Sequence, residues 1–223
     1  MELESIKEGN YFHIYNRGVN GENIFKEEKN YFYFLQQYKK YCSEVFETFS
    51  YALLKNHFHL LVYVKENVII ARSDGKGDIQ LSASKQLSHF FNSYAQAINK
   101  SYQRTGPLFE SPFGRKPVNN DEYISSLIYY CHYNAQLHQM VTNFKDWPFS
   151  SYHPILENNN KIVAVDKVLE WFGGRQPFID QHEGRYEDAR FKNIISKNNI
   201  WNLEEADLKN LQTPSAVKNP DGG

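Results

Sequence analysis

Apolar and polar residues alternate along parts of this chain and recur at helical spacing along others, and the two periods predict its strands and helices. Residues 11–18, YFHIYNRG, alternate and end at a glycine, which is typical of a strand running into a turn. Residues 26–42 have early acids, late basic residues and apolar residues at helical spacing, which predicts a helix. Residues 45–56 and 57–66 then predict two neighbouring antiparallel strands.

The next part of the chain predicts a loop and two longer helices joined by a bent segment. Residues 67–80 contain two glycines among charged residues and indicate a loop. Residues 82–104 predict a long amphipathic helix, and residues 120–138 predict another with acids in its first turn. Between them, glycine and proline interrupt residues 106–118, which favours a bent, partly extended conformation.

This order of elements predicts an α+β fold, a ferredoxin-like antiparallel sheet packed by helices. After residue 153 the pattern weakens, with a short helix around 163–172 and a second one within 177–191. We therefore expect a core domain over residues 8–153, a C-terminal helical extension over 154–212 and a disordered tail over 213–223.

Composition limits the class of protein. The 223 residues suit one medium domain with an appendage, and no apolar run is long enough to span a bilayer. The first ten residues lack the basic flank and apolar core of a signal peptide. Cys42 and Cys131 occur in unrelated contexts, so no disulfide framework or zinc–cysteine site is expected. These features predict a protein of the reducing cytoplasm.

Charge is unevenly distributed. The formal net charge of −1 argues against a protein that coats nucleic acid by bulk electrostatics. Between residues 82 and 118, however, there are five basic residues and a single acid, Glu110. This stretch predicts either a local surface for phosphates or an ordinary solvated face. Its basic residues are Lys85, Lys100, Arg104, Arg115 and Lys116.

Two histidines interrupt the apolar strand LLKNHFHLLV at residues 53–62. Side chains alternate across a strand, so His57 and His59 point to the same face of the sheet. They form either a hydrogen-bonded pair on a half-exposed sheet or two ligands of one metal ion. The metal interpretation requires further ligands, which the two histidines do not supply.

The helix at residues 120–138 offers such a ligand. Tyr130 and Asn134 are four residues apart and therefore share one helix face. The amide oxygen of Asn134 can bind a divalent ion, and the phenol of Tyr130 can act as a nucleophile. Tyr129 and Tyr133 share an adjacent face by the same spacing. The alternative for an aromatic-rich helix is simple core packing.

Five segments occur in an order that resembles a known family. The segments are YFHIYNRG, LLKNHFHLLV, GPLFESPFGRKPV, YYCHYNAQLH and DWPFSSY, and the similarity covers roughly residues 8–153. In this combination the chain resembles the REP-associated tyrosine transposases, relatives of the single-tyrosine insertion-sequence transposases within the HUH nuclease superfamily.

The resemblance implies a site and a reaction. His57, His59 and Asn134 would hold a divalent metal, Mg²⁺ or Mn²⁺, and Tyr130 would attack DNA to give a 5′-phosphotyrosine and a free 3′-hydroxyl. Many relatives have proline directly after the asparagine, whereas this chain has Ala135, so Tyr129 remains the alternative nucleophile. His132 lies two positions from Tyr130 and is predicted to be a surface or substrate-side residue.

The resemblance also implies single-stranded or hairpin, REP-like DNA as the partner, which would associate the protein with the nucleoid. The basic residues Arg17, Lys85, Lys100, Arg104, Arg115 and Lys116 are the predicted DNA-binding residues. His13 and Arg17 either approach the site or serve sheet packing and turn capping. A homodimer, with the tyrosine acting in its own subunit or across the dimer, stays open. The other function classes are a non-catalytic nucleic-acid-binding module and a two-histidine metal hydrolase that activates water.

Overall fold

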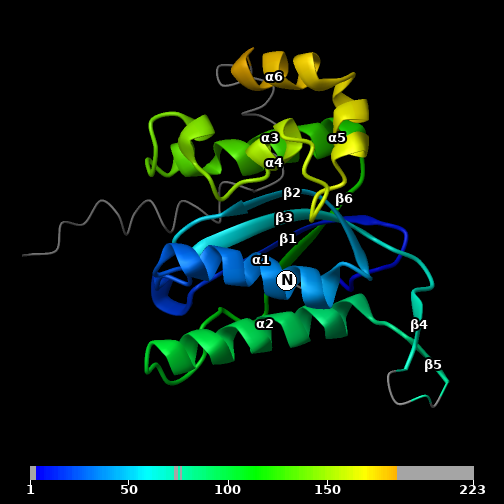
Figure 1. Ribbon diagram of the computed structural model, residues 1–223, viewed down its shortest axis with the longest axis vertical. Helices are drawn as coiled ribbons and strands as arrows, with labels where there is room; N and C mark the ends of the chain where they lie inside the picture. The colour runs from blue at the N-terminus through cyan, green and yellow to red at the C-terminus, as the bar shows by residue number, and fades with distance from the viewer. Residues whose placement is uncertain (1–3, 73–74, 76, 185–223) are drawn as a thin grey trace, which may run out of the picture.

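The computed structural model describes residues 4–72, 75 and 77–184, and one four-stranded antiparallel sheet lies at its centre (Figure 1). The sheet has the order β2-β3-β1-β6, and its strands are β1 (Tyr11–Arg17), β2 (Phe46–Leu53), β3 (His57–Val64) and β6 (Gly114–Val118). The α-helices are α1 (Glu28–Cys42), α2 (Ala83–Ser101), α3 (Asp121–Leu137), α4 (Tyr152–Leu156), α5 (Val165–Phe172) and α6 (Arg175–Gly184). Short elements complete the described chain: the 3₁₀ helices η1 (Val19–Gly21) and η2 (Phe144–Asp146), and the strands β4 (Ile69–Ala71) and β5 (Asp78–Gln80). The predicted ferredoxin-like α+β fold is therefore confirmed.

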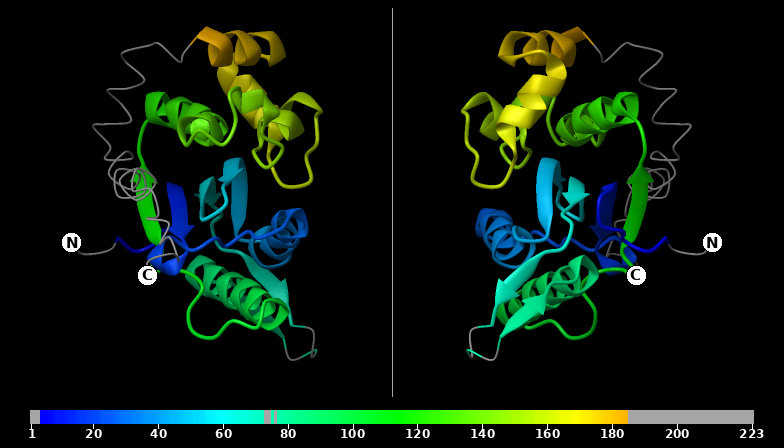
Figure 2. Two further views of the ribbon diagram at one scale, coloured as in Figure 1. Left: turned by 90° about the vertical axis from the view of Figure 1, so that its left-hand side faces the viewer. Right: turned by 90° about the vertical axis from the view of Figure 1, so that its right-hand side faces the viewer.

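Helices cover both faces of the sheet. Figures 1 and 2 show α1 and α2 on one face, and α3 with the helices that follow it on the other. On the α1–α2 face, the ring of Phe34 lies 5.0 Å from that of Phe58 on β3. His57 and His59 flank Phe58 on β3. Because side chains alternate along a strand, these two histidines point to the opposite face, under α3.

Helix α3 is buried on almost all sides, because it lies between the sheet and the C-terminal helices (Figure 2). It begins as the sequence predicts. The side chain of Asn120 accepts a hydrogen bond from the backbone N–H of Tyr123 at 2.7 Å, and Asp121 and Glu122 lie in the positively polarised first turn. The helix continues through Ala135 to Leu137, which a proline after Asn134 would have disfavoured.

The C-terminal part of the described chain covers the outer edge of β2. The N–H of Leu53 donates to the carbonyl of Phe149 at 2.9 Å, and the N–H of Ala164 donates to the carbonyl of Thr48 at 2.9 Å. These bonds satisfy backbone groups that an open sheet edge would expose to pairing with another chain. They also join the segment after residue 148 to the sheet.

One prediction of secondary structure was wrong. Residues 67–80 were predicted as a loop, but β4 and β5 pair antiparallel there, with Ile70 opposite Ile79. The glycines that suggested a loop lie at the turn of this hairpin, whose strands are exposed and too short to show a clear alternation.

The predicted helices near 163–172 and 177–191 correspond to α5 and α6. Residues 185–212 of the predicted extension and the tail at 213–223 lie outside the described residues. No helix in the described ranges is both long and apolar enough to cross a membrane.

Candidate active site

The register of the sheet places several polar side chains on the face covered by α3. In the β1–β3 pair, Arg17 is opposite His57 and Tyr15 is opposite His59. Residues directly opposite one another share a face of the sheet. His13, two residues before Tyr15, therefore points to this face as well.

Asn134 of α3 meets His57 from across this face. The Asn134 Oδ1 and the His57 Nε2 are 3.1 Å apart. On the other side of the ring, His57 Nδ1 lies 2.7 Å from the Oδ1 of Asn56. Both amide oxygens can only accept a hydrogen bond, and a neutral imidazole has a single N–H to donate. A neutral His57 can therefore donate to only one of the two amide oxygens, and its other ring nitrogen presents a lone pair to the second oxygen. Such a pair of acceptors is stabilised by a shared cation.

His59 and Tyr130 lie beside this contact. The ring of Tyr130 is 5.3 Å from that of His59, edge-on at 78°, and 6.5 Å from that of His13. The Nε2 of His59 is buried and has no hydrogen-bond partner among the described residues. Tyr129 points elsewhere, because its ring stacks on Tyr133 at 4.3 Å on the side of α3 that faces α6.

Burial keeps these imidazoles neutral. It lowers the pKa of His57 from 6.5 to about 3, with a smaller contribution from His138, and lowers the pKa of His59 well below its usual range. Among the residues that the structure describes, no group of three or more histidine, cysteine or acidic side chains is placed to hold a metal. A metal here would therefore depend on two neutral imidazoles and the Asn134 amide. That donor set, with one ring nitrogen lacking a partner, fits a divalent ion with open positions.

One residue near the site was missed by sequence reasoning. His138, the C-cap of α3, lies one turn beyond Asn134, and its ring is 4.8 Å from that of His57. The signal was present, because residues four apart on a helix share a face.

The prediction for His132 was wrong. It is fully buried, on the side of α3 away from the sheet's histidines, and not at a surface. Its Nδ1 lies 2.8 Å from His182 Nε2, and its Nε2 lies 2.7 Å from the Ser151 hydroxyl. Residues 148–184 cover this side of α3, and the pattern of the helix alone does not contain that information.

The predicted DNA-binding residues do not form one surface. Lys116 is opposite His13 in the sheet and shares its face, whereas Arg115 is opposite Ile14 and points to the α1–α2 face. Arg17, opposite His57, forms an ion pair with Glu110 at 2.7 Å. The other three are on the α2 side of the sheet: Lys85 and Lys100 in α2, and Arg104 just after it, paired with Glu22.

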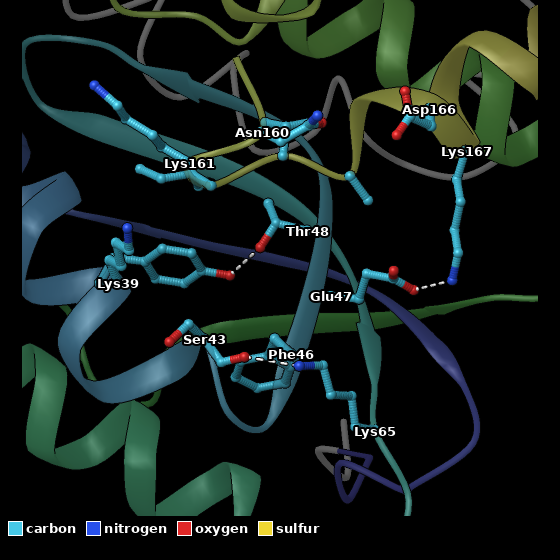
Figure 3. Close-up of a pocket in the computed structure, with 14 residues that line it drawn as sticks. Lys39, Ser43, Phe46, Glu47, Thr48, Lys65, Asn160, Lys161, Asp166 and Lys167 are labelled. Carbon is cyan, nitrogen blue, oxygen red and sulfur yellow. Dashed lines mark hydrogen bonds and ion pairs between the residues drawn. The ribbon is translucent and has the colours of Figure 1, made fainter. Parts of the chain in front are cut away.

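A lysine-lined pocket of about 550 Å³ lies apart from the site, at the outer edge of β2 (Figure 3). Two of its lysines already have partners: Lys167 pairs with Glu47 at 2.7 Å, and Lys65 donates to the carbonyl of Ser43 at 2.9 Å. None of the predicted site residues lines this pocket. We assign it no chemistry, because the histidines, the tyrosine and the amide converge under α3.

Comparisons with known proteins bear on the family resemblance and on the fold. No family model matches the chain. A curated relative from Haemophilus influenzae, a REP-associated tyrosine transposase, is 29% identical over 124 residues, which are 54% of this chain and 67% of the relative. The solved structure of a REP-associated tyrosine transposase bound to a REP hairpin matches with a TM-score of 0.56 and 14% identity, over 74% of this chain and 89% of that one. The curated relative thus confirms the resemblance found in the sequence, and the solved structure confirms the fold.

Proposed function

We propose that this protein is a metal-dependent endonuclease and strand transferase of the transposase class, which acts on single-stranded or hairpin DNA of the REP type. Homology to a REP-associated tyrosine transposase supports the transposase class. The hairpin in the solved neighbour supports REP DNA as the substrate.

One observation carries the catalytic part of the proposal. A single helix, α3, brings Tyr130 to His59 and, one turn later, Asn134 to within 3.1 Å of His57. A phenol, two imidazoles and an amide therefore lie together under α3, which supports Tyr130 as the proposed nucleophile and the other three residues as the proposed metal ligands. Core packing of a helix does not by itself require a polar contact between a buried amide oxygen and a buried imidazole nitrogen.

The residues would divide the reaction between them. His57, His59 and Asn134 would hold Mg²⁺ or Mn²⁺, which polarises a scissile phosphate and stabilises its developing charge. The phenolic oxygen of Tyr130 attacks phosphorus, so that a tyrosine–phosphate bond forms and the bond to the 3′ oxygen breaks. The phenol loses a proton, and the departing oxygen gains one. The product is a 5′-phosphotyrosine with a free 3′-hydroxyl.

This covalent product allows strand transfer. The phosphotyrosine retains the energy of the broken phosphodiester, so the 3′-hydroxyl of another strand can reverse the attack without ATP. Tyr130 is fully buried, and a phosphate must displace part of its cover to reach the phenol. An unpaired or hairpin strand can bring its backbone to a buried tyrosine more easily than a continuous duplex can.

The Tyr130→Phe variant tests the proposal. Phenylalanine keeps the ring and its packing and removes only the hydroxyl, so folding and DNA binding should survive. Formation of a covalent protein–DNA adduct in Mg²⁺ or Mn²⁺ should vanish. The measurement is a denaturing gel of the full chain incubated with labelled single-stranded hairpin DNA.

Tyr129→Phe is the matched control, because it removes a hydroxyl one residue away that faces α6. Its adduct should form at nearly the wild-type rate. If Tyr129→Phe loses the adduct and Tyr130→Phe keeps it, the nucleophile is Tyr129. Cleavage without any adduct would favour a hydrolase that activates water. Binding without cleavage by the wild type would favour a non-catalytic nucleic-acid-binding module.

A further inference from the structure

His13 on β1 forms a buried hydrogen bond with one of the proposed metal ligands. Its Nε2 lies 2.9 Å from the Nδ1 of His59 on β3, and the two rings are 5.1 Å apart and nearly parallel. His13 is fully buried, and His59 nearly so. The remaining nitrogens, His13 Nδ1 and His59 Nε2, have no hydrogen-bond partner among the described residues.

The proton in this bond decides whether His59 can bind a metal. A neutral imidazole has one N–H and one lone pair, and a hydrogen bond between two ring nitrogens needs one donor. If His13 donates, the proton of His59 is on Nε2, which then has no lone pair for a metal. If His59 donates from Nδ1, its Nε2 lone pair is available, and His13 carries its own proton on Nδ1.

We propose that His13 is a positioning residue, which accepts the Nδ1–H of His59 and so aims the Nε2 lone pair of His59 at a divalent cation. The inference rests on the proposed function. The neighbouring ligand offers the same arrangement, because the Oδ1 of Asn56, which can accept a hydrogen bond, lies 2.7 Å from the Nδ1 of His57. Each histidine of the motif thus has a group that can accept a hydrogen bond within reach of its Nδ1, which is the usual arrangement of metal-binding histidines.

Three substitutions at position 13 test this role. The side chain of glutamine is three bonds long from Cβ to Oε1 and places an acceptor where His13 has Nε2. Asparagine is one bond shorter and places its oxygen where His13 has Nδ1. His13→Gln should therefore retain most of the affinity for Mn²⁺. His13→Ala and His13→Asn should weaken it by roughly 10- to 100-fold, the usual loss when the acceptor behind a metal-binding histidine is removed.

The measurement is calorimetric titration of the full chain with MnCl₂, without DNA. His59→Ala is the reference for loss of a ligand, and His89→Ala, an exposed histidine on α2, should leave the affinity unchanged. Nitrogen-15 spectra of histidine-labelled protein in MgCl₂ give a second readout. They should show His59 protonated at Nδ1 in the wild type and in His13→Gln. Thermal unfolding of each variant checks that it is folded.

The outcomes separate this inference from the proposed function. If the wild type binds Mn²⁺ and His59→Ala does not, but Gln, Asn and Ala at position 13 all bind like the wild type, His13 has no positioning role. Equal losses for His13→Gln and His13→Asn would also overturn it, because packing alone would explain them. If the wild type does not bind Mn²⁺, or His59→Ala binds as tightly, both the metal site and the role of His13 fail.

Discussion

Two buried histidine pairs lie on opposite sides of α3, and they differ in how completely their ring nitrogens are hydrogen-bonded. On the side facing the C-terminal helices, the Nδ1–H of His182 donates to the carbonyl of Phe178 at 2.7 Å. This leaves His182 Nε2 to accept from His132, and His132 Nε2 to accept from the Ser151 hydroxyl. Every ring nitrogen of this pair has a partner, and the directions of all three bonds follow from one carbonyl.

On the side facing the sheet, the pair His13–His59 is incomplete. Its two rings share one hydrogen bond, while His13 Nδ1 and His59 Nε2 lack a partner in the described part of the chain. Buried polar groups without partners are uncommon in proteins and call for an explanation. Burial of a histidine pair therefore does not by itself indicate a catalytic or metal-binding role. The complete pair is structural, and the incomplete one is where a ligand is expected.

Removing one histidine from each pair should give the largest difference between the two pairs. His59→Ala should abolish the covalent adduct and Mn²⁺ binding and should lower the free energy of unfolding less than His132→Ala does, because its cavity and the one hydrogen bond it loses are offset by removal of a buried nitrogen without a partner. His132→Ala should lower the free energy of unfolding by about 3 kcal/mol or more, because it creates a cavity and strands two polar groups.

Urea denaturation and Mn²⁺ titration of both variants check these expectations. Folded His132→Ala should bind Mn²⁺ within a few-fold of the wild type. The contrast fails if His132→Ala loses the metal while remaining stable, or if His59→Ala destabilises the protein as much as His132→Ala does.

The stability of the metal-free protein should depend on pH through the buried site histidines. Burial lowers the pKa of both His13 and His57 from 6.5 to about 3. Above pH 6.5 both are neutral in either state and the full stability is present. As the pH falls from 6.5 towards 3, the unfolded chain binds protons that the folded chain does not, so stability decreases. Each histidine contributes a slope of up to about 1.4 kcal/mol per pH unit.

Urea denaturation in EDTA across this range measures the slope. His13→Gln should reduce it by about one histidine's share, and the exposed His89→Ala should not change it. An unchanged slope in His13→Gln would mean that His13 is not held neutral in the folded protein.

Ser151 provides a test of the fully hydrogen-bonded pair His132–His182. Its hydroxyl lies 2.7 Å from His132 Nε2, and its oxygen accepts the backbone N–H of Tyr51 at 3.0 Å. Ser151→Ala should therefore cost about 1–3 kcal/mol of the free energy of unfolding, with little change in Mn²⁺ affinity. Ser88→Ala removes an exposed hydroxyl on α2 that bonds only within its own helix, and should have almost no effect. Similar stabilities of the two variants would show that the His132–His182 pair does not depend on Ser151.

Part of the site could be predicted from local sequence, because it depends on short spacings. Two residues along a strand place His57 and His59 on one face, and four residues along a helix place Tyr130 above Asn134. The order of strands and helices, with the cap of α3, likewise follows from local patterns, and this part of the fold agreed with the structure.

The parts of the site that local sequence does not predict depend on pairings between distant segments of the chain. His13 reaches His59 over 46 residues through strand register, and His132 meets His182 over 50 residues through the helices after the sheet. Neither separation has a periodic signal in the sequence. The prediction for Arg115 and Lys116 contains a different error. These sequence neighbours were both predicted to bind DNA, but alternation along β6 puts them on opposite faces of the sheet.

The smallest expected effect tests whether the face with the incomplete pair is also the face that binds DNA. Lys116 shares the face of His13, and Arg115 points to the α1–α2 face, where its guanidinium lies 4.9 Å above the ring of Phe113. Lys116→Ala should weaken the affinity for single-stranded DNA a few-fold and reduce the salt slope by about 1, since one phosphate contact is lost.

Arg115→Ala, the matched control one residue away, should change neither the affinity nor the salt slope. Both variants are made in the Tyr130→Phe background, so that fluorescence anisotropy at several salt concentrations reports binding without cleavage. A larger loss from Arg115→Ala would place the DNA on the α1–α2 face, away from the histidines, and would separate binding from the site under α3.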